Sequence, residues 1–175
     1  MTDSLRMPTR IQHIEAILAV DANNGLAKNG KIPWKSKTDM EFFKNKTTNN
    51  IIIMGSKTLL SLPKSMPLKN RENIILTNNK EKYSNLYANI ETPIKFLNLE
   101  EVLNCLKDFN NFDKKTIYII GGNEIYNLLI PYCSTIWLTK LNKSYDCDLF
   151  FNYDLTNYNK TIVYNDSEIN IIKLD

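Results

Sequence analysis

The sequence predicts an α/β sandwich with a largely parallel central sheet and an antiparallel end. Short apolar runs rich in Ile and Val alternate with longer amphipathic stretches, which is the pattern of strands and their covering helices. Two runs, at residues 51–54 and 117–120, are apolar on both faces, as expected for central strands covered by helices. The tail differs, because residues 161–164 and 168–174 flank Asn165-Asp166-Ser167 and predict a hairpin at one edge of the sheet.

Along the chain, these patterns indicate one domain with elements in a regular order. Residues 1–12 are polar and contain Pro8, so we expect a flexible N-terminal extension before a single domain at residues 13–175. A chain of 175 residues has the usual size of one domain, and neither an internal repeat nor a long linker indicates a second. We expect strands at residues 16–20, 51–54, 73–77, 116–120 and 136–141, and helices at residues 39–46, 99–106 and 125–130.

The composition is ordinary for a globular protein and argues against several kinds of partner. Hydrophobic residues make up 43% and charged residues 23% of the chain, and the net charge of +3 is scattered without a basic stripe for nucleic acid. No apolar run approaches the roughly 20 residues that span a bilayer. The 3 cysteines include no Cys-x-x-Cys pair and His13 is the only histidine, so we expect reduced thiols and no metal site. A cytoplasmic protein without nucleic-acid or membrane partners is therefore expected.

The run Gly121-Gly122-Asn123-Glu124-Ile125-Tyr126 follows a buried apolar run and opens an amphipathic helix. At such a place the backbone amides and the helix dipole can receive a pyrophosphate, and two glycines allow a ligand to approach the backbone closely. The run lacks the Gly-x-Gly-x-x-Gly pattern, and a tight turn between strand and helix explains it equally well. The motif by itself leaves both interpretations open.

A second candidate is the loop from Gly25 to Trp34, which contains two glycines and ends in the rigid pair Pro33-Trp34. Its position after the first strand is compatible with a mobile lid over a site. Composition alone favours an ordinary surface loop whose Trp34 packs into the core.

Asp39 and Arg71 are charged side chains in specific positions. Asp39 stands in the first turn of a helix, where a carboxylate commonly caps the helix, whereas in an apolar pocket it would need hydrogen-bond donors from a ligand. Arg71 is the only arginine after residue 10 in a chain that otherwise uses lysine, and its planar fork suits a carboxylate. A solvated loop position is the alternative for Arg71.

Together these fragments resemble the dihydrofolate reductase family in order and spacing. Residues 17–34 are similar to the family's first strand and flexible loop, and Asp39 with Phe43 and Thr47 is similar to its substrate helix. The resemblance implies a three-layer sandwich with about eight strands in a mostly parallel central sheet and a C-terminal antiparallel hairpin. The first cofactor turn, the segment for the substrate tail and the later strands and turns correspond to residues 54–58, 61–71, 75–77, 121–122, 136–139 and 148–151.

The resemblance implies an enzyme that reduces 7,8-dihydrofolate to 5,6,7,8-tetrahydrofolate by hydride transfer from NADPH, in support of one-carbon metabolism and thymidylate synthesis. It also implies catalytic roles for Trp34, Asp39 and Thr139, and a non-proline cis peptide between Gly121 and Gly122. Dihydrofolate and antifolate-like small molecules would contact Ile17, Leu18, Ala19, Asp39, Met40, Phe43, Leu68, Arg71, Ile120 and Tyr126. The cofactor NADPH would contact Ala19, Leu26, Gly55, Ser56, Lys57, Thr58, Leu76, Thr77, Asn78, Ile120, Gly121, Gly122, Asn123, Glu124, Ile125 and Tyr126.

Three departures from the family pattern bear on these expectations. Gly25-Leu26-Ala27 stands where the family often has Gly-Ile-Gly, which makes the loop stiffer. Met40 replaces a frequent Phe or Leu, and its flexible side chain makes a looser pocket. Asn78 is short where the family often places a long polar or basic residue near the adenosine 2′-phosphate. A preference for NADPH over NADH then depends mainly on Lys57 and on the hydroxyls of Ser56, Thr58 and Thr77.

Two alternative functions stay open at this point. A related reductase of pyrimidine or pterin intermediates would share the sheet and the cofactor turn, but it would not need an arginine for a carboxylate tail. A non-catalytic homologue that binds NADPH would keep the fold without the reaction. Asp39 and Arg71 favour dihydrofolate reductase over the first alternative. A monomer is expected, unless the chain was excised from a fusion with thymidylate synthase.

Overall fold

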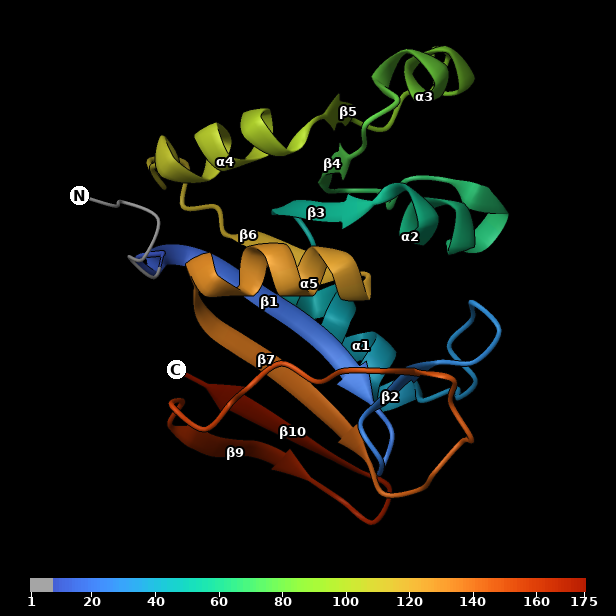
Figure 1. The fold of residues 1–175 in the computed structure, drawn as a ribbon, viewed down its shortest axis with the longest axis vertical. Helices are drawn as coiled ribbons and strands as arrows, with labels where there is room; N and C mark the ends of the chain where they lie inside the picture. The colour runs from blue at the N-terminus through green and yellow to red at the C-terminus, as the bar shows by residue number, and fades with distance from the viewer. Residues whose placement is uncertain (1–7) are drawn as a thin grey trace, which may run out of the picture.

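The computed structural model describes residues 8–175 as a central sheet with helices on both faces (Figure 1). The sheet has eight strands in the order β5-β4-β3-β6-β1-β7-β10-β9. These strands are β1 (Ile11–Val20), β3 (Ile51–Gly55), β4 (Glu72–Leu76), β5 (Ile94–Leu97), β6 (Ile117–Gly121), β7 (Cys133–Leu141), β9 (Lys160–Asn165) and β10 (Ile169–Leu174). A smaller sheet pairs β2 (Gly25–Ala27) with β8 (Leu149–Phe150).

The helices follow the strands in alternation over most of the chain. They are α1 (Lys37–Thr47), α2 (Ser56–Ser61), α3 (Lys80–Leu86), α4 (Leu99–Lys107) and α5 (Asn123–Leu129), with the short 3-10 turns η2 (Pro63–Ser65) and η3 (Ile130–Tyr132). Among residues 8–175, no helix combines the length and the apolar character needed to cross a membrane.

The predicted sheet architecture is confirmed. Strands β5, β4, β3, β6, β1 and β7 pair in parallel, and β10 pairs antiparallel with both β7 and β9. The central strands are apolar on both faces because both faces are covered: Ile52 and Ile53 of β3 are neighbours in sequence and are both fully buried. The predicted C-terminal hairpin is β9 and β10.

The two layers of the core are separated by the sheet. Ala16 and Leu18 of β1 enter the cluster that includes Leu106 of α4 and Leu129 of α5. Ile17, between them in sequence, points to the opposite face. The residues of its cluster come from α1, α2, α3 and neighbouring strands, and include Phe42, Phe43, Leu59, Tyr83, Tyr118 and Trp137.

Some boundaries and elements differ from the predictions. Strand β1 begins at Ile11, which pairs with Cys133 of β7, so two residues of the expected extension join the sheet. The first seven residues of that extension lie outside the described residues. Helix α3 and strand β5 were not predicted, because α3 is polar and buries only Tyr83, and β5 is a four-residue strand at the sheet edge.

Candidate active site

The carboxyl ends of the parallel strands meet at one edge of the sheet. Gly55 of β3 pairs with Leu76 of β4, Met54 pairs with Gly121 of β6, and Ala19 of β1 pairs with Thr139 of β7. The segments that leave these strands therefore lie together, as they do where ligands bind in open α/β sheets. Most of the predicted site residues belong to these strand ends and segments.

Helix α1 brings Asp39 to this edge. The cap of the helix is Ser36, whose hydroxyl accepts a hydrogen bond from the backbone N–H of Asp39 at 3.2 Å. The capping role that the sequence left open for Asp39 is thus filled by another residue. The Thr139 hydroxyl of β7 instead lies beside the Asp39 carboxylate and, as a hydrogen-bond donor, favours its charged form.

The surroundings of the Asp39 carboxyl disfavour its charged form. Burial raises the pKa of this carboxyl above its ordinary value, and the hydrogen bond from Thr139 opposes the rise only in part. A partly buried carboxylate with one neutral donor retains unused acceptor capacity. A ligand with N–H donors would fill that capacity.

Trp34 closes the loop that follows β1. Its side chain is 6% exposed, and its ring lies 5.6 Å from that of Tyr145. The composition-based interpretation, a tryptophan packed into the core, is therefore what the structure shows. A role in placing a catalytic water stays a prediction.

The loop between β1 and Trp34 is held by the segment around β8. Gly25 and Ala27 pair with Phe150 and Leu149, and the backbone N–H of Asn29 donates to Asp148 Oδ2 at 2.9 Å. Leu26, between these anchors, is partly buried against the larger core cluster. The predicted lid is thus attached on one side to residues more than 100 positions away, and its mobility stays a prediction.

Asp21 is a buried carboxylate that the sequence analysis missed. It accepts hydrogen bonds from the backbone N–H groups of Asn23, Gly25 and Tyr145 at 2.9, 2.7 and 2.9 Å. Burial raises the pKa of Asp21, but these donors and the Cys147 thiol outweigh it and hold the pKa below its ordinary value. An aspartate directly after a strand and four residues before a glycine is a turn signal that could have revealed this role.

Two turns at the strand ends form a cradle of backbone. Gly121 and Gly122 are joined by a cis peptide, as predicted, and Gly121 has φ of 118°. A Cβ atom at Gly121 would lie 3.1 Å from Tyr126 Oη of α5. A Cβ atom at Gly122 would lie 3.5 Å from Thr58 Oγ1 of α2, so α2 lies next to the Gly-Gly turn. Side chains at these two positions would narrow the space between α2 and α5.

The helices that begin at this cradle have no side-chain cap. Gly55 precedes α2 and Gly122 precedes α5, and neither residue has a side chain that could accept a hydrogen bond from the first helical turn. Asn98 of α4, by contrast, forms a complete capping box with Glu101. The backbone around Gly55 and Gly122 therefore fits an anionic group such as a pyrophosphate. Of the remaining predicted cofactor residues, Lys57, Asn78 and Glu124 are exposed, Ile125 is buried, and Ser56, Leu76, Ile120 and Asn123 are partly buried.

Thr77 and Tyr126 are more deeply placed than the prediction of ligand contact suggests. Thr77 is 6% exposed, and its hydroxyl accepts a hydrogen bond from the backbone of Asn79 at 3.0 Å. Tyr126 is 5% exposed and donates to the carbonyl of Ile17 at 2.9 Å. Burial, and secondarily the charge of Asp39, raises the pKa of Tyr126. Tyr126 therefore links α5 to β1 through this hydrogen bond. Its contact with a ligand stays a prediction.

Arg71 is not a freely solvated charge. Its Nη2 donates to Thr48 Oγ1 at 3.3 Å, its guanidinium lies 6.0 Å from the centre of the Phe43 ring, and its Nε is buried without a partner. Burial lowers the pKa of Arg71. A guanidinium with an unused buried donor suits an incoming carboxylate.

Two further residues of the predicted substrate site differ in exposure. Met40, the predicted neighbour of the substrate ring, is 66% exposed, and Leu68 is partly buried.

A family model and several known relatives identify one family. The family model for dihydrofolate reductase matches residues 13–170. A dihydrofolate reductase of Ureaplasma parvum is 35% identical over 152 residues, which cover 85% of this chain and 88% of that protein. A bifunctional dihydrofolate reductase-thymidylate synthase of Paramecium tetraurelia is 32% identical over 141 residues, which cover 79% of this chain and 28% of that protein.

A solved structure gives the same result. Dihydrofolate reductase from Enterococcus faecalis, complexed with NADP(H) and RAB-propyl, superposes with a TM-score of 0.73 at 26% identity. The superposition covers 92% of this chain and 94% of that one. Sequence and structure thus support the same relationship over nearly the whole chain.

Proposed function

Since the chain belongs to the dihydrofolate reductase family and reduces 7,8-dihydrofolate to 5,6,7,8-tetrahydrofolate with NADPH, we propose that Asp39 is the side chain on which substrate binding and protonation depend. The observation that carries this proposal is the partly buried Asp39 carboxylate, which has a raised pKa and a hydrogen bond from Thr139. The family match decides against the related pyrimidine and pterin reductases that the sequence left open.

In this proposal NADPH supplies the hydride, and the residues of the chain bind, orient and protect the substrate. Asp39 accepts hydrogen bonds from the amino group and the ring N–H of the pterin, which satisfies the carboxylate that burial destabilises. Its negative charge also favours proton uptake by the ring. Thr139 orients the carboxylate, and Trp34 keeps the end of the loop in place so that water enters in a controlled way.

The cofactor is proposed to bind on the backbone cradle. The turns at Gly55 and at Gly121-Gly122 adjoin and present backbone to the pyrophosphate. Ala19, Leu26 and Ile120 would limit water around the nicotinamide. The 2′-phosphate would be held by Lys57 together with the nearby hydroxyls, namely Ser56, Thr58 and Thr77.

Substitution of Asp39 by Asn tests the central claim. The amide keeps the shape of the side chain and removes its charge, so kcat at neutral pH should fall by at least about a hundredfold, roughly 3 kcal/mol of transition-state stabilisation. The assay is the decrease of NADPH absorbance with dihydrofolate across pH 6 to 8. Glu41→Gln is the control, because it removes an exposed carboxylate from the same helix and should leave kcat within about twofold. Wild-type turnover by Asp39→Asn would remove Asp39 from the mechanism.

Substitution of Arg71 by Lys tests the proposed clamp on the glutamate tail of the substrate. Lysine keeps the charge but loses the fork, so about 1–3 kcal/mol of charge-assisted hydrogen bonding is at risk and KM for dihydrofolate should rise about tenfold or more. The tail is remote from the hydride, so kcat and NADPH affinity should change little. Arg10→Lys is the matched control at the amino end of β1, where Arg10 stacks on Tyr158 at 4.1 Å. Equal losses with a dihydropterin that lacks the tail would contradict the clamp.

We further propose that the chain acts as a cytoplasmic monomer with one domain at residues 13–175. The bifunctional relative from Paramecium leaves open a fused form, in which this chain would be the reductase part. Size-exclusion chromatography with light scattering at micromolar concentration distinguishes a monomer from a dimer.

A further inference from the structure

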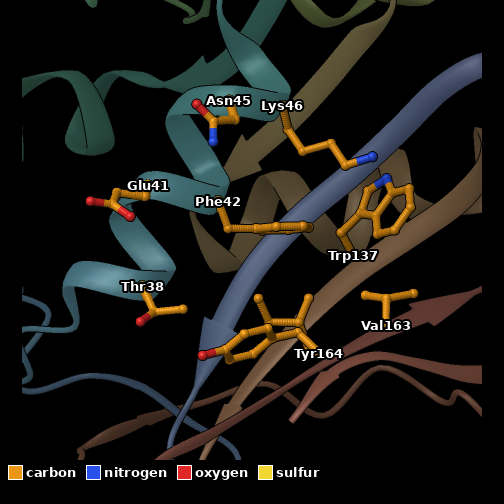
Figure 2. Close-up of a pocket in the computed structure, with 9 residues that line it drawn as sticks. Thr38, Glu41, Phe42, Asn45, Lys46, Trp137, Val163 and Tyr164 are labelled. Carbon is orange, nitrogen blue, oxygen red and sulfur yellow. The ribbon is translucent and has the colours of Figure 1, made fainter. Parts of the chain in front are cut away.

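Helix α1 has a second face, which lines a groove instead of the active site. The groove has a volume of about 470 Å³ and lies between α1 and the strands β7, β9 and β10 (Figure 2). Its walls are formed by Thr38, Glu41, Phe42, Asn45, Lys46, Trp137, Val163, Tyr164 and Ile171. Because the groove separates α1 from the C-terminal hairpin, the contacts of this helix face are concentrated on few residues.

Trp137 receives most of these contacts. Figure 2 shows Phe42 and Lys46 of α1 reaching toward the indole. The Phe42 ring meets it edge-on at 5.9 Å, and Lys46 Nζ lies 3.6 Å from its centroid. Lys173 of β10 lies 5.6 Å away over the same ring. The indole itself is fixed, because its Nε1 donates to Glu15 Oε1 of β1 at 2.6 Å.

The β9 edge of the groove anchors the start of the same helix. Tyr164 pairs with Ile171 whereas Ile162 pairs with Ile172, so Val163 is an extra residue in a β-bulge. The bulge brings the neighbouring side chains Val163 and Tyr164 to the same groove. The Tyr164 hydroxyl donates to Asp166 Oδ2 at 2.8 Å and interacts with the Thr38 hydroxyl. Helix α1 is thus held at both ends of the groove.

The order of the contacts along α1 corresponds to the order of their partners along β7. Trp137 and Thr139 point to the same face of β7 and are roughly 6.6 Å apart along the strand. Asp39 lies roughly 5–11 Å along the helix axis from Phe42 and Lys46. Asp39 lies early in α1 and contacts Thr139, whereas Lys46 lies late in α1 and contacts Trp137. Helix α1 therefore runs antiparallel to β7 and contacts it at two points.

We propose that Trp137 is a positioning residue for the reaction, which holds α1 against β7 at the separation at which Asp39 meets Thr139. This inference rests on the proposed role of Asp39. Trp137 is 9% exposed and touches neither Asp39 nor the cofactor cradle in the contacts described above. Trp137 acts through helix α1. The contacts of Lys46 and Phe42 with the indole determine the position of the helix. The hydrogen bond from Trp137 to Glu15 determines the position of the indole.

The test compares Trp137→Leu and Lys46→Met with two controls. Lys44→Met removes the other cation of the last helical turn, and Tyr83→Leu removes an aromatic side chain of the same 9% exposure from α3. We expect kcat of Trp137→Leu to fall by about tenfold to a hundredfold, the range for small misplacements near the chemistry. Lys46→Met, which keeps the aliphatic stem, should show a smaller decrease. The controls should stay within about twofold of wild type at a temperature where every variant is folded.

The pH profile of kcat distinguishes positioning from a structural role. Thr139 of β7 and Tyr126 of α5 are the polar groups identified around Asp39. Loss of the hydrogen bond from Thr139 should shift the apparent pKa of the profile upward in Trp137→Leu and in Lys46→Met, and in neither control. In an Asp39→Asn background, Trp137→Leu should have less than about a twofold further effect on kcat, because no carboxylate is left to position.

Each outcome is decisive for one claim. An unshifted profile in Trp137→Leu and Lys46→Met, or an equal decrease of kcat with and without Asp39, would overturn the positioning role. Should Trp137→Leu not fold, Lys46→Met alone carries the test, because Lys46 is only partly buried. Wild-type activity of Asp39→Asn would instead overturn the proposed site, which separates failure of the site from failure of this inference.

Discussion

Asp21 at the end of β1 and Asp39 at the start of α1 belong to two regions of the same sheet edge, and their carboxylates lie in contrasting surroundings. Asp21 is fully buried and accepts hydrogen bonds from three backbone N–H groups, and its pKa is lowered despite the burial. Asp39 is only partly buried, has one hydroxyl donor, and its pKa is raised by burial. The number of donors, more than the depth, therefore decides which charge the fold stabilises.

This difference separates a structural carboxylate, Asp21, from Asp39, for which we propose a function. Asp21 joins the loop after β1 to the segment around Tyr145 and Cys147, and it leaves little acceptor capacity for a ligand. Asp39 keeps its capacity at a cost in folding stability, which a substrate with N–H donors would recover. The same substitution, Asp to Asn, should therefore have opposite effects on stability at the two positions.

The largest effect on the stability of the fold is expected for Asp21→Asn. The amide removes the charge and places an NH2 group against a backbone N–H, so the free energy of unfolding should fall by about 2–3 kcal/mol. Urea denaturation at neutral pH measures it. Asp154→Asn is the control, because Asp154 is exposed and accepts a hydrogen bond from the backbone of Thr156. Comparable losses for both variants would show that burial and multiple donors add nothing at Asp21.

The pH dependence of that loss has a defined sign. Because the pKa of Asp21 is lower in the folded state, its contribution is present above the ordinary Asp pKa of about 3.9 and is lost as the pH falls through the folded-state value. The difference in stability between wild type and Asp21→Asn should thus be largest near neutral pH and shrink in acid. A constant difference from neutral pH to about pH 2 would contradict the assignment.

A smaller effect of opposite sign is expected for Asp39→Asn without ligand. The pKa of Asp39 is raised in the folded state, so wild-type stability decreases as the pH rises from the ordinary Asp pKa through the folded-state value. Asn cannot ionise, so the variant should have a higher Tm than wild type at neutral pH and the same Tm below about pH 3, where Asp39 is protonated in both states. Differential scanning calorimetry gives both values, and a lower Tm at neutral pH would show that Asp39 stabilises the fold.

The smallest effect is expected for Cys147→Ala. Burial and the hydrogen bond to Asp21 raise the pKa of the Cys147 thiol to about 11, so the thiol stays protonated and donates at neutral pH. Loss of this weak donor should lower the free energy of unfolding by about 1 kcal/mol and leave kcat unchanged. A loss as large as that of Asp21→Asn, measured by the same urea denaturation, would mean that the thiol, and not the backbone donors, stabilises Asp21.

Local patterns were sufficient to predict the larger elements. The apolar runs of β3 and β6 and the amphipathic pattern of α4 depend on residues close in sequence, so their positions could be predicted to within one or two residues. The short edge strand β5 and the polar helix α3 carry weak local patterns. They form because β4 and the aromatic cluster around Tyr83 and Phe96 provide a surface for them.

The candidate site shows the same limit. The family pattern predicted roles for Asp39, Thr139, Arg71 and the Gly-Gly turn, because those residue types occur in a characteristic order. It did not identify Asp21, whose donors at Gly25 and Tyr145 come from two separate loops. Nor did it identify Trp137, whose partners Glu15 and Lys46 are far apart in sequence.

By itself, the sequence determined the fold class, the family and the residue types available for chemistry, because periodicity, turn residues and motif order are local properties of the chain. The tertiary structure alone decided which carboxylate is satisfied by backbone donors, which one keeps unused acceptor capacity, and which side of α1 faces the carboxyl ends of the strands. Ionisation depends on burial and on the count of donors around a group, and these are set by segments that meet only when the sheet is assembled.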